Sequence, residues 1–131
     1  MAGMASAAML LAPGCGTGDP ETSDSAGAPL RRASFRAAVA RDFLISCAGG
    51  VGRPETAAAA ARYQELKQLG YRKEAGHALW LGENDWAAVR RHDERPPCGT
   101  GDAPYRAALA AFDARLDALA GRIAGFDGGT Q

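Results

Sequence analysis

The sequence predicts an all-α protein: a small up-and-down four-helix bundle with one disulfide, preceded by a signal peptide and a disordered tether. From Leu30 onward apolar residues recur at helical spacing, and no stretch alternates between apolar and polar residues for long enough to indicate a strand. The last segment carries a regular apolar seam, which requires helical partners. Short connections such as AGGVGR and RPPCGTG suit antiparallel neighbours.

Length and charge limit what the chain can be. Its 131 residues, 47% of them hydrophobic, fit one domain with a modest core. Its 15 basic residues are balanced by 15 acidic ones, so no electrostatic argument favours nucleic acid as a partner. We divide the chain into a signal peptide (1–14), a flexible tether (15–29), a helical bundle domain (30–127) and a disordered tail (128–131).

The N-terminal segment predicts export. Residues 1–11, MAGMASAAMLL, are uncharged and apolar. Their length matches the apolar core of a signal peptide and falls short of the ~20 residues that span a bilayer. The stretch from Gly16 to Pro29 contains turn residues and acids without a large apolar side chain, so we expect a flexible spacer there.

The residues that end at the first cysteine, Leu11–Cys15 (LAPGC), resemble the lipobox of bacterial lipoproteins. In that motif a leucine and small residues precede a cysteine that is lipidated on sulfur and becomes the mature N-terminus. The resemblance implies a lipoprotein-type signal peptide and lipid attachment at Cys15, which would hold the protein at a membrane. Gly16 stands where inner-membrane lipoproteins of two-membrane bacteria carry Asp, so the likeness favours the periplasmic side of the outer membrane. An ordinary cleaved signal peptide and a chance Gly–Cys pair are the alternatives.

The first helical segment spans residues 30–48. Phe35, Val39, Phe43 and Cys47 follow at four-residue steps around one face, so we expect them to point inward. The glycines of AGGVG end the segment, as expected past a helix C-terminus.

The second segment opens at Pro54, which suits the first helical position, and runs to Gly70. We expect Tyr63, Leu66 and either Leu69 or Gly70 to face the core.

The third segment covers about 73–92. Apolar or small residues recur there at steps of four and three: Ala75, Leu79, Gly82, Trp86 and Val89. This spacing favours one helix carried through Gly82. The alternative is a break at Gly82 with Asn84 as the N-cap of a new helix, because glycine costs ~1 kcal/mol within a helix.

The fourth segment gives the clearest pattern. Its apolar residues step by four and three along the whole helix: Tyr105, Leu109, Phe112, Leu116, Leu119, Ile123 and Phe126. Asp102 is well placed as the N-cap of this helix, with Pro104 near its first turn.

The pentapeptide CGTGD begins at Cys15 and again at Cys98. If Cys15 carries lipid, Cys47 and Cys98 remain, an even number in an oxidising compartment, so one disulfide is the simplest prediction. It would close a loop of about 50 residues and contribute roughly 3 to 4.5 kcal/mol in the chain-entropy model. The alternative is a buried Cys47 and a free thiol at Cys98.

Reactive side chains concentrate in HALWLGENDWAAVRRHDE. A small enzyme or metal binder would need His77, Glu83 and Asp85 to converge, but His77 and Asp85 lie about 12 Å apart along a helix axis. We expect Glu83 with Arg90 and Asp85 with Arg91 to form solvated pairs. Because the chain has no C-x-x-C, no H-x-x-x-H and no P-loop lysine, we predict no catalytic residue, no metal and no cofactor.

The two tryptophans are candidates for packing or for binding. Trp86 lies on the expected core face. Trp80 lies one position off it, where it either packs or forms part of an exposed recognition face. We select Trp80, Glu83, Asn84 and Arg91 as possible partner-binding residues.

A second resemblance runs from about Leu79 to Leu119. It rests on Trp86 with Arg90 four residues later, on Cys98 beyond, and on a last helix that opens with Tyr105 and carries Arg115 and Leu116. This order faintly resembles the small, disulfide-bonded, helical lysozyme-inhibitor-like domains of bacterial envelope proteins. The chain lacks the Gln before the Trp and the second nearby cysteine that are usual there, so we transfer no residue roles.

The expected function is that of a small bacterial envelope lipoprotein that acts by binding, as a non-catalytic interaction or structural module. Its partners would be an unknown envelope protein and, through lipid on Cys15, a membrane. The alternatives are an inhibitor of a cell-wall hydrolase, as the second resemblance implies, and a small enzyme or metal binder.

Overall fold

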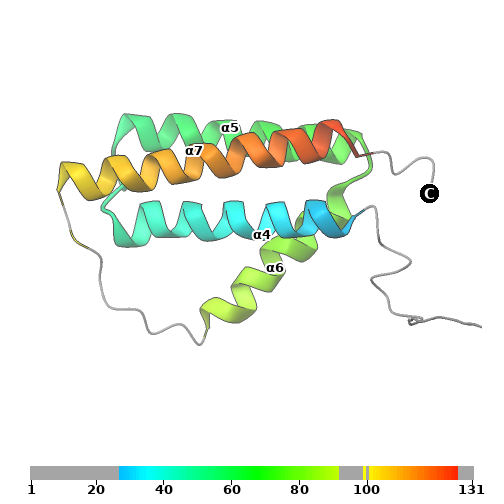
Figure 1. The fold of residues 1–131 in the computed structure, drawn as a ribbon, viewed down its shortest axis with the longest axis horizontal. Coiled ribbons are helices and arrows are strands. Elements are labelled where there is room, and N and C mark those ends of the chain that lie inside the picture. Colours follow the sequence, from blue (N-terminus) through cyan, green and yellow to red (C-terminus); the bar gives the residue numbers. More distant parts are fainter. Residues whose placement is uncertain (1–26, 92–98, 100, 127–131) are drawn as a thin grey trace, which may run out of the picture.

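The structure, a computed structural model, describes residues 27–91, 99 and 101–126 (Figure 1). These residues form α4 (Ala28–Asp42), the π-helix η2 (Phe43–Cys47), α5 (Pro54–Arg72), α6 (Gly76–Arg90) and α7 (Asp102–Ala124). No strand occurs among them, so the predicted all-α bundle is confirmed. The predicted signal peptide, most of the predicted tether, Cys98 and the predicted tail lie outside the described residues.

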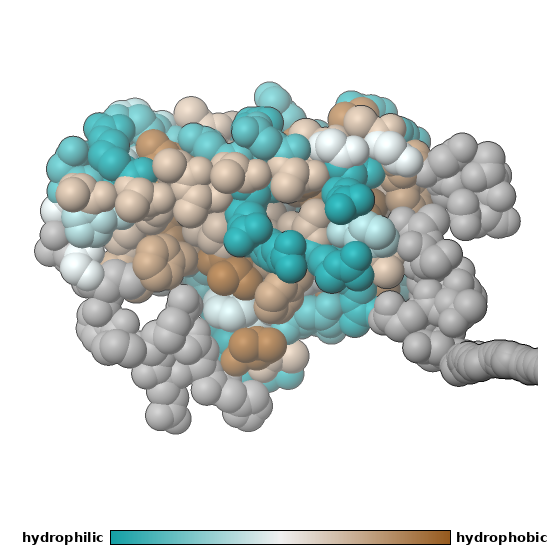
Figure 2. Space-filling model, viewed as in Figure 1, coloured by the Kyte–Doolittle hydropathy of each residue, from teal (hydrophilic) through white to brown (hydrophobic). Residues whose placement is uncertain are grey.

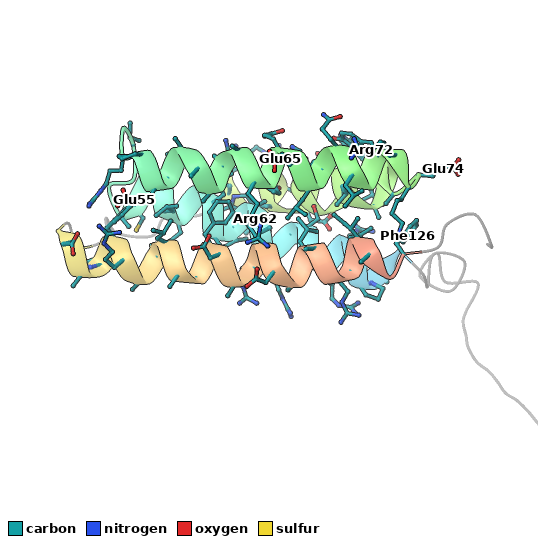
Figure 3. The ribbon with its side chains drawn as sticks, turned by 90° about the horizontal axis from the view of Figure 1, so that it is seen from above. Glu55, Arg62, Glu65, Arg72, Glu74 and Phe126 are labelled. Carbon is teal, nitrogen blue, oxygen red and sulfur yellow. The ribbon has the colours of Figure 1, made fainter. Side chains whose placement is uncertain are left out.

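The α-helices of this described part reverse direction from one to the next, as expected for an up-and-down bundle, but they do not pack in sequence order. α4 packs mainly against α6 and α7, and α5 packs mainly against α7. In Figure 1, α4, α5 and α7 lie side by side, whereas α6 crosses obliquely to them. The ion pairs Arg106–Glu55 and Arg62–Asp117 advance together along α5 and α7, so these two helices run in the same direction (Figure 3).

The core is built around α7, as its apolar seam predicts. Five seam residues are fully buried: Tyr105, Phe112, Leu116, Leu119 and Ile123. Leu109 and Phe126 are partly buried and pack against them. The ring of Phe112 meets that of Tyr63 on α5 edge to face, with centroids 5.9 Å apart, a favoured aromatic geometry.

The residues predicted to face inward on the first helix are not its most buried ones. Phe35, Val39, Phe43 and Cys47 are only partly buried. The buried residues are smaller for the most part: Leu30, Ala33, Ser34, Ala37 and Leu44. The helix also begins at Ala28, two residues before the predicted start, with Pro29 in its first turn.

The reason for the error is the close approach of α6. A Cβ added at Gly82 would lie 2.6 Å from Ser34 Cβ and 2.8 Å from the backbone nitrogen of Phe35. Ser34 Oγ donates a 2.7 Å hydrogen bond to the carbonyl of Leu79, so the hydroxyl is satisfied although it is buried. Two helices this close require small residues on both sides, so serine and alanine replace the larger side chains at the contact.

The second helix follows its prediction. It begins at Pro54 and buries Tyr63 and Gly70, while Leu66 is partly buried and Leu69 is 36% exposed. Gly70 again marks a close approach, because a Cβ there would clash with Leu79 of α6. Near the start of α5, the hydroxyls of Thr56 and Tyr105 share a buried 2.9 Å hydrogen bond.

The third segment forms one helix through Gly82, so the alternative break with Asn84 as N-cap is wrong. It begins later than expected, at Gly76, because the chain first turns at Glu74, whose φ is 61°. Ala75, Leu79, Gly82 and Trp86 are buried as predicted. Val89 is 50% exposed, so its predicted inward position is wrong.

The start of α7 also differs from its prediction. Gly101, with φ 118°, is the N-cap residue, and no side chain caps the helix. Asp102 is the first helical residue, and its carboxylate pairs with Arg53, the N-cap residue of α5, and with Arg106. The sequence therefore placed the helix start one residue too late.

The outer side of the described helices mixes polar and weakly apolar residues. Hydrophilic side chains alternate with a row of weakly hydrophobic ones along α7 in Figure 2. Within the described part of the chain, no helix combines the length and the hydropathy that a membrane span requires.

Candidate functional site

The structure places three of the four predicted partner-binding residues on one exposed side of α6. Trp80 is 56% exposed, which decides between its two predicted positions. The His77 ring stacks on the indole, with centroids 6.2 Å apart and ring planes inclined by 18°. Asn84 and Arg91 follow at four and eleven residues from Trp80 and are also exposed. These spacings put all four side chains on the same helix face.

Tyr71 extends this surface, and the sequence did not identify it. Its side chain is 47% exposed. A Cβ added at Gly76 would lie 2.8 Å from Tyr71 Cδ1, so the ring lies over the first turn of α6, four residues before Trp80. Gly76, at the start of the helix and five residues after Tyr71, was the feature of the sequence that could have indicated this contact. We call Tyr71, His77, Trp80, Asn84 and Arg91 the α6 outer face.

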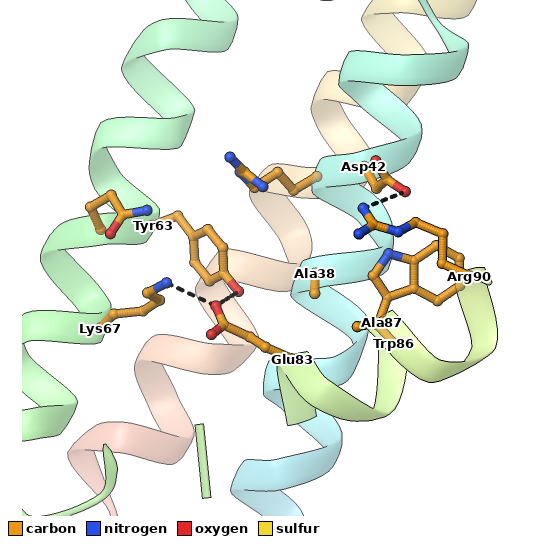
Figure 4. Close-up of a pocket in the computed structure, with 10 residues that line it drawn as sticks. Ala38, Asp42, Tyr63, Lys67, Glu83, Trp86, Ala87 and Arg90 are labelled. Carbon is orange, nitrogen blue, oxygen red and sulfur yellow. Dashed lines mark hydrogen bonds and ion pairs between the residues drawn. The ribbon is translucent and has the colours of Figure 1, made fainter. Parts of the chain in front are cut away.

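Glu83, the fourth predicted residue, does not lie on the α6 outer face. It points toward α5, where Tyr63 Oη donates a 2.7 Å hydrogen bond to its carboxylate and Lys67 Nζ donates one of 2.9 Å (Figure 4). Both charged side chains are largely shielded, with exposures of 16% for Lys67 and 28% for Glu83. Glu83 therefore joins α6 to α5. It lies on a different side of α6 from Asn84, because consecutive side chains on a helix are rotated by about 100° from each other.

A polar cleft of about 240 Å³ lies between α4, α5 and α6, beside this hydrogen-bonded group (Figure 4). Its lining residues are Ala38, Arg41, Asp42, Tyr63, Gln64, Lys67, Glu83, Trp86, Ala87 and Arg90. The buried Tyr63 and Trp86 form its inner part, whereas Arg41, Gln64 and Arg90 are exposed at its rim. The sequence did not predict this cleft, because its charged residues come from three helices.

Burial and the hydrogen bond to Glu83 raise the pKa of Tyr63 far above its ordinary value. The phenol is therefore a neutral hydroxyl at any physiological pH, and it serves as a donor to the carboxylate. The positive charge of Arg41 acts in the opposite direction on the pKa of Tyr63.

The predicted local ion pairs along the third helix do not form. Asp85 accepts two hydrogen bonds from Arg31 of α4, at 2.7 and 2.8 Å, and these bonds lower the pKa of its carboxyl. Arg90 pairs with Asp42 of α4 at 3.7 Å instead of with Glu83. The charges of α6 thus tie it to its neighbours.

The residues of the enzyme or metal-binder alternative diverge. His77 stacks on Trp80, Glu83 contacts α5, and Asp85 contacts α4. Among the described residues, no group of three or more His, Cys, Asp and Glu side chains is placed to hold a metal ion.

The predicted cysteine sites lie partly outside the described residues. Cys47, at the end of η2, is disulfide-bonded. Cys15 and Cys98 fall outside the described ranges, so lipid attachment and the pairing of Cys47 with Cys98 stay predictions.

No protein-family model matches this chain, and comparisons with curated proteins and with solved structures find no significant similarity.

Proposed function

We propose that this chain is a small, non-catalytic interaction module of the bacterial cell envelope. In this proposal, lipid on Cys15 anchors it on the periplasmic side of the outer membrane, and the α6 outer face binds another envelope protein. The observation that carries the proposal is the exposure of Trp80, with His77 stacked against it.

The chemistry of the α6 outer face supports binding. Tryptophan, tyrosine and arginine dominate the energetics of protein interfaces, and Trp80, Tyr71 and Arg91 occur together here. The stack with His77 restricts the indole, so less conformational entropy is lost when a partner covers it. We infer a partner surface with an apolar pocket for Trp80 and an acidic group within reach of Arg91.

The anchoring part of the proposal is supported by the residues Leu11–Cys15 and by the start of α4 at Ala28. Between Cys15 and Ala28 the chain can extend to at most about 45 Å. A lipid on Cys15 would therefore keep the bundle near the membrane while leaving α6 free to meet a partner.

Site-specific photo-crosslinking in the native host tests the binding proposal. With a photoreactive amino acid in place of Asn84, we expect one defined envelope protein to be captured. The same amino acid in place of Ala111, exposed on α7, should not capture it.

The Trp80→Ala substitution provides the second arm. Loss of a central tryptophan costs about 2 kcal/mol or more, so affinity should fall about 30-fold or more and crosslinking from position 84 should nearly vanish. Val51→Ala removes another exposed apolar side chain, 73% accessible and on a different surface, and should leave crosslinking unchanged. Equal capture from positions 84 and 111, or capture that is insensitive to Trp80→Ala, would refute the proposal.

A further inference from the structure

The polar cleft contains more positive charge and more hydrogen-bond donors than its own acids can use. Three cations line it, one from each helix: Arg41 from α4, Lys67 from α5 and Arg90 from α6. Only two carboxylates line it, those of Asp42 and Glu83, which leaves one net positive charge.

The contacts of these cations show where the surplus lies. Lys67 donates one hydrogen bond to Glu83, and an ammonium has three N–H groups. Arg90 Nη1 lies 3.7 Å from Asp42 Oδ2, so the two residues form an ion pair but no hydrogen bond. Arg41 makes no ion pair with any residue in the described ranges. Donors from three helices thus surround one space.

We propose that the polar cleft binds a small oxyanion, a molecule with carboxylate or phosphate groups, held by Arg41, Arg90 and Lys67. Guanidinium groups match the paired acceptor oxygens of both anions. The volume of about 240 Å³ lies below the range of drug-sized ligand pockets, so the ligand is small. This site is separate from the α6 outer face and does not depend on its function.

The inner part of the cleft is already ordered. Glu83 fixes both Tyr63 and Lys67 through hydrogen bonds, so an entering anion meets a positioned ammonium group. Glu83 also competes with that anion for Lys67. The same carboxylate therefore organises the site and limits its affinity.

Titration calorimetry of the full-length protein with citrate and with inorganic phosphate tests the proposal. We expect saturable binding of at least one anion at low ionic strength. Arg41→Gln should weaken it at least tenfold. Arg36→Gln makes the same charge change on the exposed side of the same helix, outside the cleft, and should change affinity less than twofold.

The Glu83→Gln variant tests for a gain in anion affinity, which a misfolded protein would not show. An amide oxygen can still accept the hydrogen bonds from Tyr63 and Lys67, but it carries no negative charge that competes with an anion for Lys67, so anion affinity should rise severalfold. The proposal is overturned if neither anion binds at a concentration of about 10 mM. It is also overturned if Arg36→Gln and Arg41→Gln weaken binding equally, or if Glu83→Gln lowers the affinity. Binding to anionic vesicles without binding to either soluble anion would also overturn it.

Discussion

At the scale of single residues, the position of α6 is set by an absent side chain. Gly82 meets backbone atoms of α4, including the carbonyl of Arg31 and the nitrogen of Phe35. Backbone atoms cannot rotate away as a long side chain can, so any Cβ at this position must push the two helices apart.

Gly82→Ala therefore should destabilise the protein by about 1 to 3 kcal/mol, although alanine is the better helix former. Gly121→Ala is the matched control, because Gly121 lies within α7 and a Cβ there meets nothing within 4 Å. That substitution should stabilise the helix by about 0.5 to 1 kcal/mol. Urea unfolding followed by circular dichroism measures both changes. A Gly82→Ala protein as stable as the wild type would show that the close contact does not exist.

At the scale of helices, the end of α7 depends on a residue from another connection. Lys73, just after α5, donates hydrogen bonds from Nζ to the carbonyls of Ile123 (2.9 Å) and Ala124 (2.8 Å). The last carbonyls of a helix have no partner within it, so this ammonium satisfies two of them.

Lys73→Met should therefore loosen the last turn of α7 by about 1 kcal/mol, and amide hydrogen exchange there should accelerate about fivefold. Arg122→Met removes a charge from the same last turn without removing these hydrogen bonds, so its effect should be smaller. Equal acceleration by the two variants would indicate a general charge effect at the helix end.

At the scale of the whole molecule, cysteine chemistry connects the fold to its expected location. We expect intact mass spectrometry of the protein from its native host to show cleavage before Cys15 and a lipid-sized mass increase. Unmodified Cys15 still joined to Met1 would exclude the anchor. In the same sample, thiol labelling without reductant should leave Cys47 and Cys98 unreacted, because we predict that they form one disulfide. Reaction of both would refute the pairing.

The sequence was sufficient for the fold class and for the approximate position of each helix. The seam from Tyr105 to Phe126 and the start at Pro54 are confirmed, because both depend on residues within a few turns of one another. It also identified the exposed candidates Trp80, Asn84 and Arg91, since helix periodicity fixes which residues share a face.

The sequence could not predict pairings across long separations. Arg31 and Asp85 are 54 residues apart, and Tyr63 and Glu83 are 20 apart. Glu83 was assigned to the wrong side for this reason, because only the position of α5 shows which neighbour its carboxylate meets.

By itself, then, the sequence determined the helices and the apolar stripe of α7, because backbone hydrogen bonding and side-chain periodicity are local. Only the tertiary structure decided that α5 lies beside α7, that α6 approaches α4 at Gly82, and that cations from three helices surround one cleft. These features depend on how closely particular side chains allow two helices to pack, and such contacts join residues far apart in the chain.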